Sequence, residues 1–354
     1  MKEKITIIGA GHQGLTMAAH LGDNGVDCYL WNRTRTHIEE VQRTGKIICT
    51  GILDKEVAIY KASDNIEEVL QKNIMVTTPS SAHRDVAKML APYVDNTYTI
   101  VLNPGRTFGI LDFIYELENA GCTSLPCVAE TQTIVYTCRR DELNGVRLYA
   151  LKKNVPVATL NYREMPRIMR AFPSCLRGYF KPVESYIETS LGNVGMILHC
   201  APVLMNVGWI ENKKVRFEYY YDGITPTVAN LLERLDSERV KISEAMGHRV
   251  ETIIEWLQRT YATYGKNLYE NLQSNTFYRG IDAPVSVHHR YLEEDIPNGL
   301  VALESVGEAL GIRTPVASEI ISFANVVMNC DYRVKGRKYA LLKDVEYKYR
   351  RTKC

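Results

Sequence analysis

Several signals that would place this chain outside the class of ordinary globular enzymes are missing. Its nine cysteines include no Cys-x-x-Cys spacing, which argues against the common zinc and thiol-redox motifs. No apolar run suits a membrane span, because the most apolar window, about residues 190–210, is interrupted by Asn193, His199, Pro202 and Asn206. The 43 basic residues nearly balance the 41 acidic ones, so nothing indicates nucleic acid or an anionic membrane as a partner.

A secretory signal is also missing from the start of the chain. The opening stretch "MKEKITIIGAG" enters a strand pattern within a few residues. We therefore expect no targeting segment, reduced cysteines and a cytoplasmic location. A length of 354 residues predicts two domains, each able to bury a core of its own.

The first half of the chain alternates strand and helix patterns. Short apolar runs predict strands at 4–8, 28–31, 73–77, 99–102 and 124–129, and helical patterns between them include 14–22, 83–90 and 111–120. Such alternation predicts a parallel sheet with right-handed crossovers. The fold class is therefore α/β, with a Rossmann-type doubly wound parallel sheet in residues 1–184.

The pattern changes at about residue 185, where strand signals disappear. Long helical periods are expected at about 186–208, 226–247, 249–262 and 299–311. Residues 185–354 are therefore predicted to form an all-α C-terminal domain that would hold the substrate.

The first strand ends in "IIGAGHQG", in which Gly9, Gly11 and Gly14 fit the pattern Gly-x-Gly-x-x-Gly. The first glycine permits a tight turn, the second lets the backbone approach a pyrophosphate, and the third lets the helix pack against the strand. His12 and Gln13 lie inside this turn, where the helix N-terminus offers free N–H groups to phosphate. A strand before the motif and a helix after it are the context that a dinucleotide-binding site requires.

The second strand ends in "YLWNRTRT", where an NAD enzyme usually carries Asp or Glu for the ribose hydroxyl. This chain has Asn32, Arg33, Thr34 and Arg35 instead. Arginines bind a 2′-phosphate that a carboxylate would repel, so NADPH is favoured over NADH. The alternative is that the two arginines only begin a solvated helix.

Two further loops follow predicted strands at the edge where ligands bind in open α/β sheets. "TTPSSAHRD" contributes Thr78 and Pro79, and "LNPGRTFG" contributes Asn103, Pro104 and Gly105. We expect both to flank the cofactor, although either sequence would also suit a plain turn.

His199 lies in the middle of the apolar stretch "GMILHCAPVLMNVG". A buried imidazole is costly unless it is hydrogen-bonded, and histidine is well suited to proton transfer near neutral pH. The segment "HHRYLEEDIPNGL" supplies Asp295 and Arg290. From the residues alone, His199 is either a bonded core histidine or a proton donor, Asp295 either caps a helix or acts in catalysis, and Arg290 is either a surface ion-pair partner or a substrate ligand.

Several segments resemble the NAD/NADP octopine/nopaline dehydrogenase (opine dehydrogenase) family. They are "GNVGMILHCAPVLMNVGWIE", "YYYDGITPTVANLLERLDSERVKISEAMG" and "RYLEEDIPNGL" in the helical half, with "LNPGRTFG" and "AETQTIVYTCR" in the first half. Cys200, Phe108 and Val207 depart from the family pattern, which bears on the shape of the pocket.

The resemblance implies an oxidoreductase acting on CH–NH donors. An L-amino acid condenses with a 2-oxo acid such as pyruvate, and hydride transfer from NAD(P)H reduces the imine. His199 would be the acid/base, Asp295 would orient it, and Arg290 would bind a substrate carboxylate. The family often forms dimers, which implies a homodimer, and no metal site is expected.

Two other functional hypotheses compete with this one. Ketopantoate-reductase-like and hydroxyacid dehydrogenases share the two-domain plan but use a catalytic lysine, and this chain has no lysine between Ser185 and Gly208. A sensor that binds NADP without chemistry would have no need of the three residues His199, Arg290 and Asp295.

Overall fold

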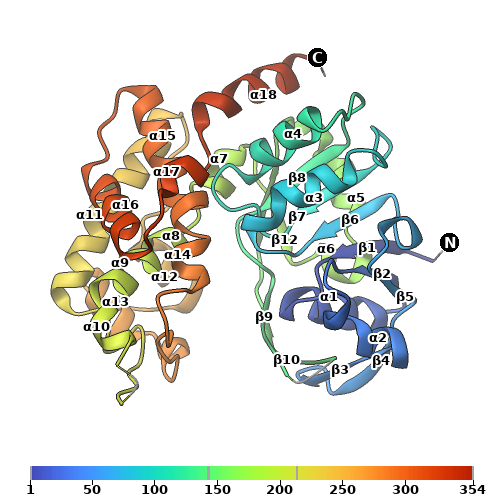
Figure 1. The fold of residues 1–354 in the computed structure, drawn as a ribbon, viewed down its shortest axis with the longest axis horizontal. Coiled ribbons are helices and arrows are strands. Elements are labelled where there is room, and N and C mark those ends of the chain that lie inside the picture. Colours follow the sequence, from blue (N-terminus) through green and yellow to red (C-terminus); the bar gives the residue numbers. More distant parts are fainter. Residues whose placement is uncertain (1, 142–143, 213, 353–354) are drawn as a thin grey trace. The chain divides into compact units, whose positions relative to one another are not determined.

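The computed structural model describes residues 2–141, 144–212 and 214–352. The chain forms two compact units, one of Met1–Thr189 with Val345–Cys354 and one of Ser190–Asp344 (Figure 1). The boundary predicted from the sequence, between residues 184 and 185, lies slightly earlier, and the last residues were predicted to belong to the helical part. As a statement about separate domains, that division stays a prediction.

The first unit is built on an eight-stranded sheet in the order β12-β11-β8-β7-β6-β1-β2-β5. The strands are β1 (Lys4–Ile8), β2 (Asp27–Trp31), β5 (Lys61–Ser63), β6 (Asn73–Val76), β7 (Thr99–Leu102), β8 (Cys127–Thr131), β11 (Val155–Thr159) and β12 (Phe180–Pro182). The six strands from β8 to β5 are parallel, whereas β11 runs antiparallel to β8. The predicted doubly wound sheet is confirmed, with this reversed pair at one edge.

Strand order fixes the faces that the helices cover. The chain moves from β1 to β2 in one direction along the sheet and from β6 to β7 and β8 in the other. Right-handed crossovers therefore place α1 (His12–Asp23) on one face and α3 (His83–Leu90) and α4 (Gly109–Asn119) on the opposite face. The other helical segments of the unit are η1 (Arg35–His37), α2 (Glu39–Thr44), η2 (Ile66–Glu68), η3 (Ser80–Ala82), η4 (Tyr162–Glu164), α5 (Met165–Ala171) and α6 (Ser174–Arg177), with α7 (Tyr186–Ser190) and α18 (Tyr339–Thr352) at its borders.

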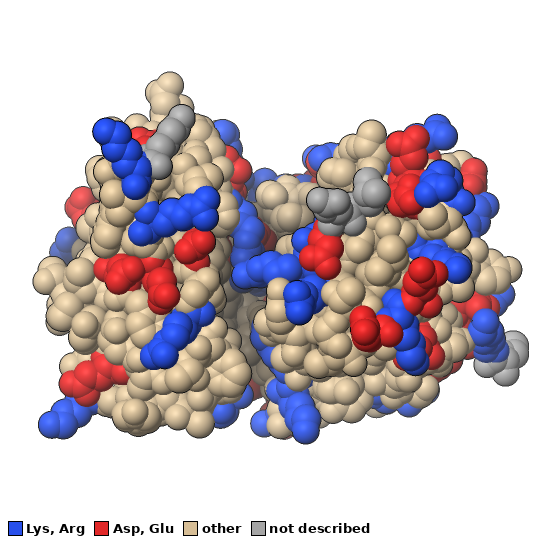
Figure 2. All heavy atoms as spheres, turned by 90° about the horizontal axis from the view of Figure 1, so that it is seen from below, with Lys and Arg blue, Asp and Glu red and all other residues tan. Residues whose placement is uncertain are grey.

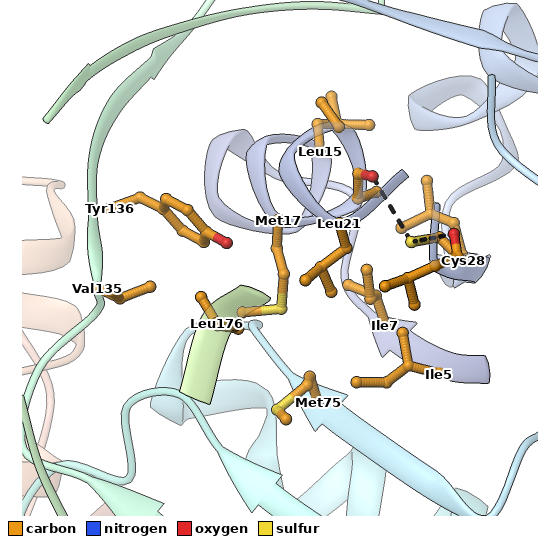
Figure 3. Packing of buried hydrophobic residues seen from close by; sticks show 14 of the residues in the cluster. Ile5, Ile7, Leu15, Met17, Leu21, Cys28, Met75, Val135, Tyr136 and Leu176 are labelled. Atoms are coloured by element: carbon orange, nitrogen blue, oxygen red, sulfur yellow. Dashed lines mark hydrogen bonds between the residues drawn. The ribbon is translucent and has the colours of Figure 1, made fainter. Parts of the chain in front are cut away.

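A second sheet, which the sequence analysis does not predict, covers the outer side of α1. Its order is β4-β3-β10-β9, and its strands are β3 (Lys46–Gly51), β4 (Lys55–Ala58), β9 (Tyr136–Arg140) and β10 (Gly145–Leu151). One apolar cluster joins the three layers: Ile7 and Cys28 come from the main sheet, Leu15 and Met17 from α1, and Tyr136 from the second sheet (Figure 3).

The second unit is helical, and its only β pairing among the described residues is one bridge between Glu218 and Asp282. Its elements are α8 (Gly195–Leu198), α9 (Cys200–Met205), α10 (Val207–Ile210), α11 (Pro226–Ala245), α12 (Ile253–Tyr261), α13 (Leu268–Ser274), η5 (Thr276–Tyr278), α14 (Arg290–Glu293), the π-helical turn η6 (Ile296–Leu300), α15 (Val301–Leu310), α16 (Pro315–Val327) and α17 (Tyr332–Lys335). The prediction of one long helix over 186–208 is wrong, because that stretch is broken into α7, α8, α9 and α10.

The surface carries charges of both signs. Figure 2 shows Lys and Arg interspersed with Asp and Glu over the face of each unit that is in view. In the described part of the chain, no helix combines the length and the apolar character that crossing a membrane requires.

Candidate functional site

The carboxyl ends of the parallel strands form one straight edge. The register pairs Ile8 with Trp31 and with Val76, Val76 with Leu102, and Leu102 with Glu130. The residues that follow them, including Gly9, Asn32 and Asn103, therefore emerge side by side. The strand order reverses between β1 and β6, which is the switch point where open α/β sheets bind ligands.

The glycine-rich turn has the geometry that its sequence predicts. Gly9 has a φ of 107°, a left-handed conformation that disfavours side chains. A Cβ on Gly14 would collide with the carbonyl oxygen of Gly9, whereas a Cβ on Gly11 would meet no atom within 4 Å. The turn is thus tightly packed behind Gly14 and open in front of Gly11, where a pyrophosphate would approach backbone at the start of α1.

The side chain of Asn32 connects the end of β2 to this turn. Its Oδ1 accepts from the N–H of Ala10 at 2.9 Å, and its Nδ2 donates to the carbonyl of Thr34 at 2.9 Å. Arg33, Thr34 and Arg35 are exposed beyond it. Arg33 forms an ion pair with Asp85 at 3.2 Å, so one of the two predicted phosphate ligands already has an anionic neighbour.

Buried polar atoms without partners lie along the same edge. Gln13 Oε1, Thr78 Oγ1 and Asn103 Nδ2 have no hydrogen-bond partner among the described residues. Such atoms are costly unless a ligand or water satisfies them. Gln13 lies in the first turn of α1, and Thr78 and Asn103 lie in the loops after β6 and β7, so a dinucleotide along this edge would meet all three.

The remaining predicted cofactor residues shape these loops. Pro79 precedes the short helix η3, and Asn103 and Pro104 are joined by a cis peptide bond. A Cβ on Gly105 would collide with the buried Glu130 side chain, which accepts from the N–H of Ile110 at 2.8 Å. His12 begins α1. The structure thus brings the predicted set to one edge, while their contact with a cofactor stays a prediction.

The helical unit brings His199 and Asp295 together across 96 positions of sequence. The distance between His199 Nδ1 and Asp295 Oδ2 is 2.7 Å, with the histidine side chain 12% exposed and the aspartate side chain fully buried. Because a carboxylate only accepts, Nδ1 is the donor in this hydrogen bond. The Asp295 side chain makes no capping hydrogen bond to η6, and its role in catalysis stays a prediction.

A break between α8 and α9 positions His199. Pro202 has no N–H to give to the carbonyl of Leu198, as a continuous helix would require. The hydroxyl of Tyr219 replaces it, lying 3.2 Å from the Leu198 carbonyl oxygen and 2.7 Å from that of His199. Burial raises the pKa of Tyr219 well above its usual value, so this hydroxyl remains a donor.

The short helix α14 forms the other side of the pair. The rings of Tyr291 and His199 stack with centroids 3.9 Å apart and an interplanar angle of 11°. Cys200 Sγ also contacts the carbonyl of Tyr291 at 3.4 Å. The imidazole is therefore fixed both in its plane and at Nδ1, which is the preorganisation that proton transfer needs.

Arg290 lies in the same helix with its side chain 48% exposed. It forms an ion pair with Glu294 at 3.7 Å, and its guanidinium lies 5.3 Å from the centre of the Tyr291 ring. Burial, and then the charges of Arg290 and His199, lower the pKa of the neighbouring His289 below its usual value. His289 therefore remains neutral near pH 7, and Arg290 supplies the fixed positive charge beside the pair.

Several residues of the resembling motifs support the site from a distance. Asn206 Nδ2 donates to the carbonyls of Pro202 and Gly223, at 2.8 and 2.9 Å. The fully buried Arg239 donates to Asp236 and to the carbonyl of Leu191. The Arg239 contact joins the segment before His199 to α11, and the Asn206 contacts join α9 to the loop that precedes α11.

The aromatic residues of the helical unit lie in different environments. Tyr219, Tyr220 and Tyr278 are buried, and Trp209 is 37% exposed and stacks on Phe217 at 4.0 Å. Trp209 and Phe217 line a cavity of about 410 Å³ in the helical unit whose lining includes neither His199, Asp295 nor Arg290. In the described residues, no cluster of His, Cys, Asp and Glu suits a metal ion.

Sequence reasoning overlooked Tyr291 and Arg140. Arg140, on β9 of the unpredicted sheet, donates to the carbonyls of Ala10 and His37 at 3.0 and 3.1 Å. It thereby connects the glycine-rich turn to the arginine-bearing loop. Its only sequence signal was its place at the end of "AETQTIVYTCRR".

Comparison with known families divides the chain much as the structure does. Residues 182–328 match the model for "NAD/NADP octopine/nopaline dehydrogenase, alpha-helical domain". Residues 5–105 match the model for "Ketopantoate reductase PanE/ApbA".

Similarity to individual proteins extends over nearly the whole chain. An opine dehydrogenase of Arthrobacter sp. (strain 1C) is 30% identical over 341 residues, which cover 94% of this chain and 92% of that protein. The fold is similar to yersinopine dehydrogenase with NADP+ bound, with a TM-score of 0.79, 13% identity and coverage of 99% of both chains. It is also similar to octopine dehydrogenase with NADH and L-arginine, with a TM-score of 0.75, 19% identity and coverage of 93% of this chain and 90% of that one.

Proposed function

The chain belongs to the opine dehydrogenase family of NAD(P)H-dependent oxidoreductases that act on CH–NH donors, and from this premise we propose how its residues perform the reaction. The reaction is a reductive condensation of an L-amino acid with a 2-oxo acid. The amine adds to the carbonyl carbon, water leaves, and reduction of the resulting imine gives a secondary amine that carries two carboxylates. The observation that carries the proposal is the His199–Asp295 pair beside Arg290.

His199 is proposed to move the protons. Loss of water from the carbinolamine requires an acid at the departing oxygen, and Nε2 is the ring nitrogen that Asp295 does not occupy. Asp295 holds the ring in one tautomer and stabilises the imidazolium when His199 is protonated. Stacking on Tyr291 keeps Nε2 in one direction through the cycle.

Arg290 is proposed to bind the carboxylate of the 2-oxo acid. The carboxylate of a 2-oxo acid is bonded to the reacting carbonyl carbon, so the cation that binds it must lie near the acid/base. Arg290 meets this condition because it is adjacent in the chain to Tyr291, which stacks on His199. Its ion pair with Glu294 at 3.7 Å is long and half-exposed, so exchange for a substrate carboxylate costs little.

The first unit is proposed to hold the cofactor at the edge formed by Gly9, Gly11 and Gly14. The open space at Gly11 and the unpartnered atoms of Gln13, Thr78 and Asn103 fit a dinucleotide. When bound, the nicotinamide supplies the hydride. We propose NADPH as the preferred form, because Arg33 and Arg35 stand where NAD enzymes carry an acidic side chain.

A ketopantoate-reductase-like activity is the alternative. Its family model covers only residues 5–105, which is the part that many nucleotide-binding enzymes share. No lysine lies between Ser185 and Gly208, and the acid/base pair of the helical unit is His199 with Asp295. The helical unit therefore favours the condensation.

Product analysis tests the reaction. We expect the wild-type enzyme, given NADPH, pyruvate and the correct L-amino acid, to form a product whose mass is the sum of the two substrates less one oxygen atom. With deuterium on the transferring face of NADPH, the label should appear at the carbon derived from the oxo group. Lactate as the only deuterated product would contradict the condensation.

The cytoplasmic location and the homodimer stay predictions. Sedimentation equilibrium of the purified chain, with and without NADPH, tests the dimer. A monomer at micromolar concentration under both conditions would contradict it.

A further inference from the structure

A lysine of the first unit lacks a counter-ion at the edge where substrates are expected. Lys152 follows β10 and is partly buried. Its Nζ donates to the carbonyl of Ile134 at 3.0 Å and lies 3.3 Å from Thr133 Oγ1. Both acceptors are neutral, and no carboxylate is among the titratable groups that act on Lys152 in the described residues.

The fold places this ammonium at the carboxyl end of β8. Thr133 and Ile134 belong to the loop that follows β8, and the Lys152 N–H donates to the carbonyl of Val135 at 2.8 Å. Asn32 follows β2, on the side of the sheet where the adenosine half of a dinucleotide is expected. Since β7 and β8 lie on the other side of β1, a dinucleotide bound across the switch point extends its nicotinamide half toward them.

Electrostatics at this position favour an anion. Burial, and then the positive charge of Arg106 in the loop after β7, lower the pKa of Lys152 to about 8. Cys138 on β9 is the other titratable group near it, and burial raises the pKa of that thiol, so it does not supply a negative charge near neutral pH. A partly buried cation next to a second cation is costly until an anion pairs with it.

The proposed reaction supplies such an anion. Its product carries two carboxylates, and Arg290 of the helical unit accounts for the one from the 2-oxo acid. We propose that Lys152 binds the second carboxylate, the α-carboxylate of the amino-acid substrate, and thereby selects amino acids over simple amines. This inference rests on the proposed function, because it assigns a ligand group of that same reaction.

A pair of small ligands isolates this contact. The first, 2,2′-iminodipropionate, is a secondary amine with both carboxylates, and N-ethylalanine is the same amine with only one. Their dissociation constants are measured by calorimetry on the NADPH-saturated enzyme, which requires no turnover. The variants are Lys152→Met and Lys152→Arg, and Lys153→Met alters the exposed neighbour as the matched control.

We expect Lys152→Met to weaken the binding of 2,2′-iminodipropionate roughly 10- to 100-fold, as loss of a charge-assisted hydrogen bond does. The same variant should change the binding of N-ethylalanine little. The dissociation constant of 2,2′-iminodipropionate should remain within about threefold of wild type in Lys152→Arg, because arginine keeps the charge. In Lys153→Met it should not differ from wild type. Equal weakening of both ligands, no effect of Lys152→Met, or no binding of the dicarboxylate by wild type would overturn the inference.

A pH series supplies a second readout. Since the lowered pKa means that Lys152 loses its charge as the pH rises through about 8, wild-type affinity for the dicarboxylate should fall over that range. In Lys152→Arg the fall should be absent, because arginine stays charged. Identical pH dependence in the two proteins would contradict the role of Lys152.

The inference and the proposed function fail in different ways. If the wild type makes no condensation product but the ligand pair behaves as expected, the carboxylate site is real and the proposed reaction is wrong. If the wild type makes the product and Lys152→Met binds both ligands normally, the reaction is right and the assignment of Lys152 is wrong.

Discussion

At the scale of single residues, the account depends on one hydrogen bond. His199 Nδ1 and Asp295 Oδ2 are 2.7 Å apart, and the aspartate side chain is fully buried. If this carboxylate sets the tautomer, replacing it with an amide changes the chemistry while leaving the shape of the site intact.

Asp295→Asn should therefore reduce kcat roughly 10²- to 10⁴-fold, the range that positioned acid–base groups contribute. His199→Ala should reduce kcat at least as much, and both variants should bind NADPH normally because the cofactor edge lies in the other unit. Steady-state kinetics and cofactor fluorescence measure the two effects. The control is His288→Ala, which removes a histidine side chain that is 72% exposed; turnover in His199→Ala equal to that of this control would refute the acid/base role.

Cofactor preference also depends on single side chains. Arg35→Ala should raise the Kd of NADPH roughly 10-fold or more and leave that of NADH unchanged, because only NADPH carries the 2′-phosphate. Asn32→Asp should shift preference toward NADH, since a carboxylate repels that phosphate and binds the ribose hydroxyl. Fluorescence titration measures both constants, with Arg43→Ala, an exposed arginine paired with Glu40, as the matched control. An equal loss of affinity for NADPH and NADH in Arg35→Ala would rule out a contact with the 2′-phosphate.

At the scale of elements, the break between α8 and α9 is the feature that positions His199. The break leaves the Leu198 carbonyl without a helical donor, and the Tyr219 hydroxyl lies within hydrogen-bond distance of it. The His199 carbonyl accepts from the same hydroxyl and from the N–H of Val203. We expect Tyr219→Phe to lower the free energy of unfolding by about 1–3 kcal/mol, the cost of leaving a buried carbonyl unsatisfied. The variant should also reduce kcat by a larger factor than it changes the KM of the 2-oxo acid. Urea denaturation and kinetics test this against Tyr264→Phe, a tyrosine that is 76% exposed; matching behaviour of the two variants would show that the hydroxyl does not support the break.

The buried ion pair of α11 supports the same segment. Arg239 is fully buried and donates to Asp236 at 2.8 Å and to the Leu191 carbonyl at 2.6 Å. Arg239→Met leaves Asp236 buried without its cation, so we expect a loss of about 3–5 kcal/mol in the free energy of unfolding. Arg234→Met, at an exposed position of the same helix, should change little in the same urea titration. A similar small effect at both positions would mean that the pair is not structural.

The elements that were predicted correctly are those that a single physical signal identifies. Buried parallel strands read as apolar runs, so β1, β2, β6 and β7 were predicted within a residue or two of their bounds. The sheet of β3, β4, β9 and β10 was not predicted, because its strands alternate buried and exposed residues over short lengths and its parallel pair joins segments about 100 positions apart. The prediction of one helix over 186–208 was wrong because the apolar periodicity continues across 191–194, His199 and Asn206, where the helix is interrupted.

The sequence predicted those site residues that belong to a recognisable motif. The glycine turn, Asn32, His199, Asp295 and Arg290 follow from patterns or from the family resemblance. Tyr291, Arg140 and Lys152 did not, since their roles come from tertiary contacts that leave no local spacing. The distance that joins His199 to Asp295 spans 96 positions, and only the fold reveals it.

At the scale of the whole molecule, the division of labour follows the two compact units. The unit of Met1–Thr189 with Val345–Cys354 presents the dinucleotide edge, and the unit of Ser190–Asp344 carries the acid/base pair. Family membership assigns the activity to the complete chain, because the 30% identical relative is covered over 92% of its length. The account therefore requires that neither substrate alone consumes the cofactor.

The most direct test is the oxidation of NADPH and NADH, in parallel, across a grid of L-amino acids against 2-oxo acids, with wild type and His199→Ala. We predict oxidation only where both substrates are present, faster with NADPH, and lost in His199→Ala. Oxidation that needs the 2-oxo acid alone, at the same rate with or without any amine, would contradict the account and identify a hydroxyacid dehydrogenase.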